Sequence, residues 1–82
     1  MDKSIVSNEY KIFLKLLKNI RTERACTQEN LAYRIGETQS FISKCERGER
    51  RIDIVELRHF CLGMGITLGE FAQEFEAALM RG

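Results

Sequence analysis

Residues 27–48 read TQENLAYRIGETQSFISKCERG, and this stretch decides the fold. Each half opens with a threonine, whose hydroxyl readily caps a helix N-terminus. Each half also closes with a glycine, the residue that most often follows a helix. The first half predicts a helix from Thr27 to about Ile35, ended by Gly36, and the second predicts a helix from Thr38 to Arg47, ended by Gly48. Two short helices separated by two or three residues are therefore expected.

The rest of the chain continues the helical pattern on both sides of this pair. Apolar residues recur at steps of three and four over 8–24, 53–64 and 67–80, which predicts three further helices. Asp53 followed by Glu56, and Thr67 followed by Glu70, form capping boxes at two of the starts. No segment shows the alternation of a β-strand. The expected architecture is all-α, a compact five-helix bundle with short connections.

The apolar positions of each helix predict which side is buried. We expect the helix at 53–64 to bury Ile54, Leu57, Cys61 and Met64, and to end at Gly63 and Gly65. The last helix carries an apolar stripe that can finish the core but extends beyond it. The residues of that stripe are Leu68, Phe71, Ala72, Phe75, Ala78 and Leu79.

Length and composition allow one domain. The chain has 82 residues, 44% of them hydrophobic and 30% charged, which is ordinary for a globular protein. We assign residues 1–82 to a single domain with a core at about 9–72. No apolar run approaches the ~20 residues of a membrane span, and the N-terminus lacks an apolar stretch of signal-peptide length. A cytoplasmic protein with no membrane partner is expected.

The charge is distributed unevenly along the chain. The net charge is only +1, but residues 1–35 carry seven Lys/Arg against four Asp/Glu, and residues 53–82 carry two against five. Such an asymmetry suits a half that binds a polyanion joined to a half with another role.

Most catalytic and metal sites lack the necessary residues. His59 is the one histidine, and Cys26, Cys45 and Cys61 are widely spaced with no Cys-x-x-Cys pair. We expect reduced, buried thiols, with a redox switch as the alternative. No enzyme activity, cofactor or metal is expected.

Two short helices around Gly36 are typical of a helix-turn-helix motif, in which the second helix enters the major groove of DNA. The chain resembles the phage-repressor (XRE/Cro) family of helix-turn-helix domains over about residues 12–72. The matching segments are Leu17-Lys18-Asn19-Ile20-Arg21, Thr27-Gln28-Glu29-Asn30-Leu31-Ala32 and Phe41-Ile42-Ser43-Lys44-Cys45-Glu46-Arg47-Gly48.

A narrower likeness lies in Gln39-Ser40-Phe41-Ile42-Ser43, which resembles the Arg-Thr-Tyr-Ile-Ser of restriction–modification controller proteins. Small prophage repressors and antitoxin-type regulators share the same core.

The resemblance implies a DNA-binding surface. Gln28 would bind a phosphate at a helix N-terminus, while Thr38, Gln39 and Ser40 would face bases or the nearest phosphates. Lys44 would reach a guanine or a phosphate. Arg47 would touch the DNA backbone, and Arg50 and Arg51 would approach phosphates or the minor groove. An exposed side chain without a DNA contact is the alternative for Gln28, Ser40, Ser43, Lys44, Arg50 and Arg51. The full set is Gln28, Thr38, Gln39, Ser40, Ser43, Lys44, Arg47, Arg50 and Arg51.

The resemblance also implies a structural pair, Arg21 with Glu46, joining the first helix to the end of the third. Phe41 would pack partly against the second helix, with a thymine methyl contact or a wedge near the operator centre as alternatives. Asn30 stands where the family often has Glu, so an incomplete capping box is expected at Thr27. Glu37 and Glu49 would repel phosphate unless they point away.

The last helix, residues 67–80, is expected to support a homodimer through Phe75, Ala78 and Leu79. The function that follows is a sequence-specific double-stranded DNA-binding transcriptional regulator, a repressor or controller, acting as a dimer on a palindromic operator. The alternative is a helix-turn-helix module that binds a protein, such as an antitoxin or adaptor, which the acidic C-terminal third would suit.

Overall fold

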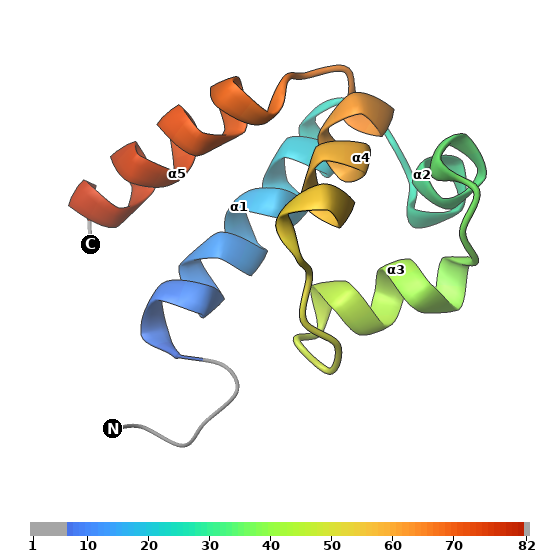
Figure 1. Ribbon diagram of the computed structural model, residues 1–82, viewed down its shortest axis with the longest axis horizontal. Helices are drawn as coiled ribbons and strands as arrows, with labels where there is room; N and C mark the ends of the chain where they lie inside the picture. Colours follow the sequence, from blue (N-terminus) through green and yellow to red (C-terminus); the bar gives the residue numbers. More distant parts are fainter. Residues whose placement is uncertain (1–6, 82) are drawn as a thin grey trace.

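A computed structural model describes residues 7–81 of the chain. They form five α-helices, and no strand occurs among these residues. The helices are α1 (Asn8–Glu23), α2 (Gln28–Ile35), α3 (Gln39–Glu46), α4 (Ile54–Met64) and α5 (Leu68–Arg81), shown in Figure 1. The predicted all-α bundle is confirmed. None of the helices within 7–81 has the length and apolarity needed to cross a membrane.

The helix starts follow local side-chain chemistry. At α1, Ser7 Oγ accepts a hydrogen bond from the Tyr10 amide at 3.2 Å. At α5, Thr67 Oγ1 accepts from the Glu70 amide at 3.0 Å, and Glu70 Oε1 accepts from the Thr67 amide at 2.8 Å. Each bond satisfies an amide that the first helical turn leaves without a partner.

The capping box of α2 is complete, so the expectation of an incomplete box at Thr27 is wrong. Thr27 Oγ1 accepts from the Asn30 amide at 3.0 Å, and Asn30 Oδ1 accepts from the Thr27 amide at 3.1 Å. The asparagine side chain is one methylene shorter than glutamate but still presents a carbonyl oxygen within reach of the cap amide. α2 then ends at Gly36, whose left-handed backbone (φ 73°) suits glycine.

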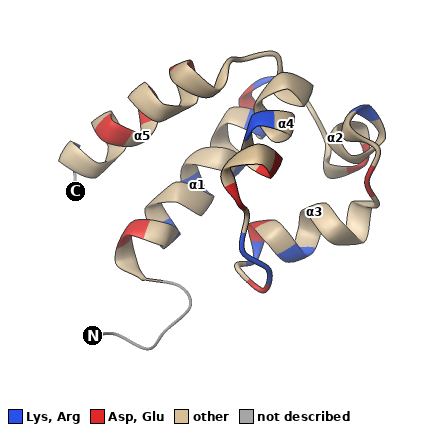
Figure 2. Cartoon of the chain, in the orientation of Figure 1, with Lys and Arg blue, Asp and Glu red and all other residues tan. Residues whose placement is uncertain are grey.

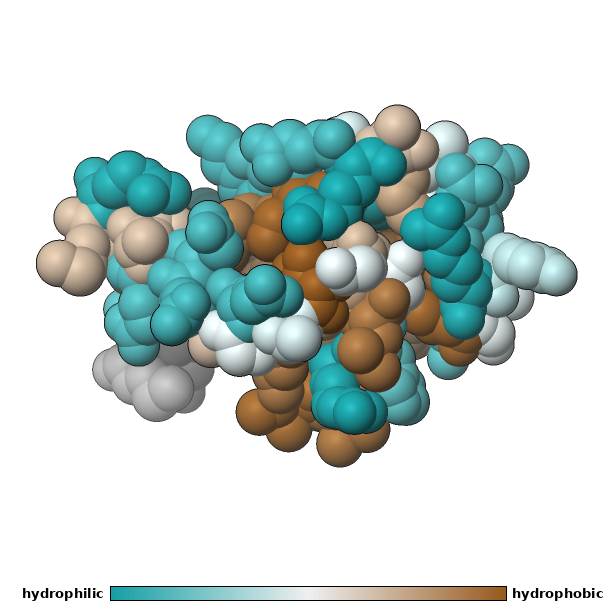
Figure 3. Space-filling model, turned by 90° about the horizontal axis from the view of Figure 1, so that it is seen from above, coloured by the Kyte–Doolittle hydropathy of each residue, from teal (hydrophilic) through white to brown (hydrophobic). Residues whose placement is uncertain are grey.

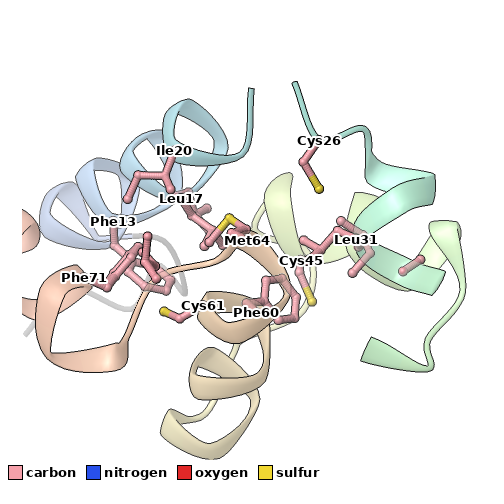
Figure 4. Packing of buried hydrophobic residues seen from close by; sticks show 14 residues of the cluster. Phe13, Leu17, Ile20, Cys26, Leu31, Cys45, Phe60, Cys61, Met64 and Phe71 are labelled. Atoms are coloured by element: carbon pink, nitrogen blue, oxygen red, sulfur yellow. The ribbon is translucent and has the colours of Figure 1, made fainter. Parts of the chain in front are cut away.

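The core draws buried side chains from all five helices (Figure 4). Leu17 of α1 is fully buried and Met64 of α4 is 3% exposed. The predicted buried side of α4 is wrong at its first turn, because Ile54 is 68% exposed while Phe60 is 1% exposed. The helix turns Leu57, Phe60, Cys61 and Met64 inward, and its first turn projects beyond the edge of the core.

Gly63 does not end α4, contrary to expectation. The helix continues through it to Met64, and Gly65 (φ 85°) forms the C-cap. A Cβ atom built on Gly63 would lie 2.7 Å from Leu31 Cδ1 and 2.8 Å from Ile35 Cγ2. Gly63 therefore lets α2 pack directly against the α4 backbone.

This packing leaves α3 at one edge of the molecule. In Figure 1, α3 lies along the lower edge beside α2, and α5 lies at the opposite, upper side. α3 packs against α2 and α1. Its other side faces away from the bundle.

Candidate nucleic-acid interface

The outward side of α3 is polar and accessible. Ile42 and Cys45 point inward and are fully buried. Thr38 caps the helix by accepting a hydrogen bond from the Phe41 amide at 3.1 Å. The outward side of the segment from Thr38 to Arg47 is thus not covered by its own chain. Its exposed members are Thr38, Gln39, Ser40, Lys44 and Arg47, and Ser43 is half-buried.

A buried ion pair holds the C-terminal end of α3. Arg21 Nε donates to Glu46 Oε2 at 2.6 Å, and Arg21 Nη2 donates to Glu46 Oε1 at 3.0 Å. The two side chains are 8% and 4% exposed. Arg21 Nη1 also donates to the Cys26 carbonyl at 2.8 Å, which ties the α1–α2 connection to the same pair. The structure thus brings Arg21 and Glu46 together as the resemblance implies.

Two glutamines extend this pair to the surface. Gln28 Nε2 donates to Glu46 Oε1 at 2.9 Å, and Gln39 Nε2 donates to Gln28 Oε1 at 2.6 Å. Gln28 is half-buried, whereas Gln39 is exposed at the first turn of α3. The buried carboxylate therefore orients Gln28, and Gln28 orients Gln39.

Arg47 is paired within its own loop. Its Nε donates to Glu49 Oε2 at 2.7 Å, and its Nη1 donates to the hydroxyl of Ser43. The Arg47 guanidinium lowers the pKa of the Glu49 carboxyl through this hydrogen bond. Arg47 thus compensates the charge of Glu49, which reduces the repulsion between Glu49 and a DNA phosphate that the sequence led us to expect.

Arg50 and Arg51 lie in the same loop, but their side chains contact different helices. Arg50 donates to both carboxylate oxygens of Glu56 in α4, at 2.9 and 2.7 Å, and its guanidinium carbon lies 4.7 Å from the centre of the Phe41 ring. The guanidinium carbon of Arg51 lies 4.4 Å from the centre of the Tyr10 ring in α1. The Phe41 ring is half-buried and meets Phe60 of α4 edge-on, with ring centres 6.1 Å apart, so its packing partner here is α4.

Comparison with known proteins identifies the fold family. The sequence profile of the helix-turn-helix family matches residues 17–71, which is most of the chain and includes α2 and α3. The chain belongs to the helix-turn-helix (XRE) family. This is a family of DNA-binding transcription regulators, not a family of enzymes.

Proteins similar to this chain include controller proteins and an XRE-family like protein. The chain is 35% identical over 71 residues to the control protein C.MunI of Mycoplasma sp., covering 84% of this chain and 96% of that one. A solved XRE-family like protein from Pseudomonas syringae pv. tomato is 40% identical, with a TM-score of 0.79 over 84% of each chain. The wild-type restriction–modification controller protein C.Esp1396I is 26% identical, with a TM-score of 0.85 over 93% of this chain and 99% of that one.

Basic residues of this XRE-family chain gather at the edge formed by α3. Figure 2 shows blue segments on α3 and in the loop after it, while α5 carries red segments. The residues are Lys44, Arg47, Arg50 and Arg51. The same stretch also carries Glu37, Glu46 and Glu49, so this edge is only weakly basic, and the excess of Lys/Arg in residues 1–35 lies mainly on α1.

The residues singled out for a dimer lie on two sides of α5. Phe75 is half-buried and lines an apolar groove of about 420 Å³ between α4 and α5. Leu79 is half-buried further along α5. Ala78 instead lines a separate hollow against α1, with Ile12 and Leu16. The groove is lined by Phe13, Ile54, Leu57, Leu68, Gly69, Phe71, Ala72 and Phe75. Seen from above, apolar atoms run through the middle of the molecule to one edge, between hydrophilic flanks (Figure 3).

The three thiols are enclosed in the core. Cys26, Cys45 and Cys61 are free and buried, as expected for small apolar residues. Burial raises the pKa of the Cys61 thiol to about 11 and also raises that of Cys45. Thiolates, which react with oxidants, are therefore disfavoured at neutral pH.

Sequence reasoning missed two residues that shape this surface. The sequence predicted only a capping role for Glu56, and Tyr10 only falls within the apolar pattern of residues 8–24. In the structure Glu56 binds Arg50, and the Tyr10 hydroxyl accepts a hydrogen bond from the Ile52 amide at 3.1 Å. Arg50 and Glu56 are six residues apart across a loop, so no helical spacing signals their contact.

Proposed function

We propose that the protein binds double-stranded DNA sequence-specifically, as a dimer on a palindromic operator, with α3 in the major groove. The observation that supports this most is the row of hydrogen bonds from buried Glu46 through Gln28 to exposed Gln39. A pre-oriented side chain at the first turn of an exposed helix is what direct reading of a base requires, because less conformational freedom is lost on binding.

The residues of α3 and of the loop after it fall into two groups, those proposed to read bases and those proposed to bind phosphate. An amide side chain can bond adenine N6 and N7 together, which suits Gln39, and lysine suits guanine O6 and N7, which suits Lys44. Thr38, Ser40 and Ser43 flank these two positions. Arg51 is proposed to approach the DNA backbone, where contacts add affinity but no sequence information.

A second copy is the proposed occupant of the groove between α4 and α5. Ile54 (68% exposed) and Val55 (60% exposed) open α4 directly after the loop that carries Arg51. Apolar side chains at this place would join two copies beside the DNA. A two-fold dimer would set two copies of α3 about one DNA turn apart, ~34 Å, and so read a palindrome.

Selection of bound duplexes from a random pool, at stated salt, tests the proposal. Two symmetric half-sites about 10 base pairs apart are expected among the selected sequences. No enrichment, together with no shift of random DNA at low salt, would contradict DNA binding and favour the protein-binding alternative.

Two substitutions then separate base reading from backbone contact. Gln39→Ala is expected to relax the base preference, with a loss of ~1–3 kcal/mol for the selected site and little change on random DNA. Arg51→Ala is expected to weaken binding to all sequences and to reduce the salt slope by about 1. Equal effects of both variants on all DNA would contradict base reading by Gln39.

The names of the relatives support a narrower proposal. C.MunI is called a control protein and C.Esp1396I a restriction–modification controller protein. We propose the same role for this chain. Selected sites lying upstream of restriction or methyltransferase genes would support it, whereas sites confined to unrelated promoters would contradict it.

A further inference from the structure

The Arg50 side chain is engaged on three sides within the chain. Its Nη1 and Nη2 atoms donate to the two oxygens of Glu56, its Nη1 also donates to the Arg51 carbonyl at 2.9 Å, and its guanidinium covers the Phe41 ring. A bidentate pair with carboxylate has a fixed planar geometry. These bonds use three of the five guanidinium N–H groups, and Glu56 compensates the charge that would attract a phosphate.

The Glu56 side chain is itself held in place by hydrogen bonds at the start of α4. Its amide donates to Asp53 Oδ1 at 2.8 Å, and its Oε1 accepts from the Asp53 amide at 3.0 Å, so the carboxylate belongs to the capping box of α4. The side chain is 25% exposed, against 45% for Arg50. The Arg50 guanidinium is thus anchored to the start of α4 rather than to a mobile side chain.

Phe41 links this anchor to α3. One contact of its ring is the Arg50 guanidinium, and another is Phe60 of α4, which is 1% exposed. Phe41 follows Gln39 and Ser40 on the first turns of α3. Contacts that hold the Phe41 ring against α4 therefore also help to hold the turn that carries the proposed base-reading residues.

We propose that Arg50 is a positioning residue, not a DNA contact: paired with Glu56, it holds Phe41 against α4 and so sets the placement of α3. The inference rests on the proposed function, in that α3 enters the DNA groove. It revises the expectation that Arg50 approaches a phosphate or the minor groove.

Charge distinguishes the two roles of Arg50. If Arg50 bound phosphate, Glu56→Gln would release it and remove a negative charge, so binding to all DNA would tighten. If Arg50 positions α3, Glu56→Gln and Arg50→Gln should both weaken binding to the selected site, roughly three- to tenfold, with affinity for random DNA and the salt slope unchanged. Arg50→Lys keeps the charge but not the bidentate fork, so it should not rescue the loss.

Binding titrations at several salt concentrations measure these outcomes, with Arg51→Gln as the matched control whose salt slope should fall by about 1. A slope lowered in Arg50→Gln and restored in Arg50→Lys would overturn the inference, as would tighter binding by Glu56→Gln.

A measurement without DNA separates this inference from the proposed function. Amide hydrogen exchange of α3 in the free protein should be faster in Arg50→Gln and Glu56→Gln, and unchanged in Arg51→Gln. Unchanged exchange in all three would overturn the positioning role even if DNA binds. Faster exchange in the first two, with no DNA bound by the unmodified protein, would contradict the proposed function alone.

Discussion

The pair of Arg21 and Glu46 is the most costly contact to disturb at the scale of single residues. Both side chains are withdrawn from water, and Glu46 also receives a hydrogen bond from Gln28. Burying two charges is expensive in itself, so the pair is weak evidence for net stability. Removing one partner, however, leaves the other charge buried without compensation. The main effect of the pair is therefore to fix the C-terminal end of α3 against α1, and its contribution to the net stability of the fold is small.

Arg21→Met is expected to lower the free energy of unfolding by ~3 kcal/mol, because the buried Glu46 carboxylate loses both of its hydrogen bonds from the guanidinium and its charge is left without compensation. Urea denaturation followed by circular dichroism measures the change. Lys18→Met, at an exposed position of the same helix, should change stability by less than about 0.5 kcal/mol. A similar loss in both variants would contradict a special role for the pair.

The Cys61 thiol should make stability depend on pH in the alkaline range. Its pKa is about 11 in the fold against 9.0 as the ordinary value, so the unfolded chain releases its proton first. The corresponding stability is fully present below pH 9 and is lost as pH rises to about 11, a loss of ~2–3 kcal/mol. Denaturation at pH 8, 9, 10 and 11 measures it. Cys61→Ala should lose less stability over this interval, and an identical decline in both proteins would contradict the assignment.

At the scale of helices, local chemistry made the fold predictable. Four helices, α2 to α5, begin directly after the Thr or Asp cap that the sequence predicts, because capping depends on neighbours along the chain. What the sequence did not reveal depends on contacts between helices. Exposed Ile54 and the pair of Arg50 with Glu56 are examples, since helical periodicity does not say where the core ends or which loop side chain turns back.

The close packing of α2 against Gly63 is another contact between helices that the sequence does not reveal, and it leads to a prediction. Alanine favours a helix interior by about 1 kcal/mol over glycine, so periodicity alone would predict that Gly63→Ala stabilises α4. Its Cβ would lie 2.7 Å from buried Leu31 and 2.8 Å from Ile35, and we expect a net loss of ~1–2 kcal/mol. Gly69 in α5 has open space, its nearest such contact being Thr67 Oγ1 at 3.8 Å. Gly69→Ala should be neutral or stabilising. Thermal unfolding of both variants measures the difference, and equal effects at both sites would contradict the packing role.

At the scale of the whole molecule, function depends on where polar and apolar surfaces lie relative to each other. α3 presents polar side chains at one edge, and the loop after it leads directly into the exposed first turn of α4. A second copy seated on the groove between α4 and α5 would therefore lie beside the proposed DNA surface. The proposed dimer contact and the proposed DNA contact are joined by only seven residues, 47–53.

This arrangement predicts that dimer and operator binding are lost together. Ile54→Glu places a charge in the apolar groove at a side chain that is already 68% exposed, so the monomer fold should be retained. Sedimentation at micromolar concentration should show monomer, and affinity for the selected palindrome should fall at least tenfold because two half-sites no longer bind as one unit. Leu62→Glu, the same change at a 53% exposed position on the same helix but away from the groove, should remain dimeric and bind fully. Dimeric Ile54→Glu with unchanged affinity would place the dimer contact elsewhere.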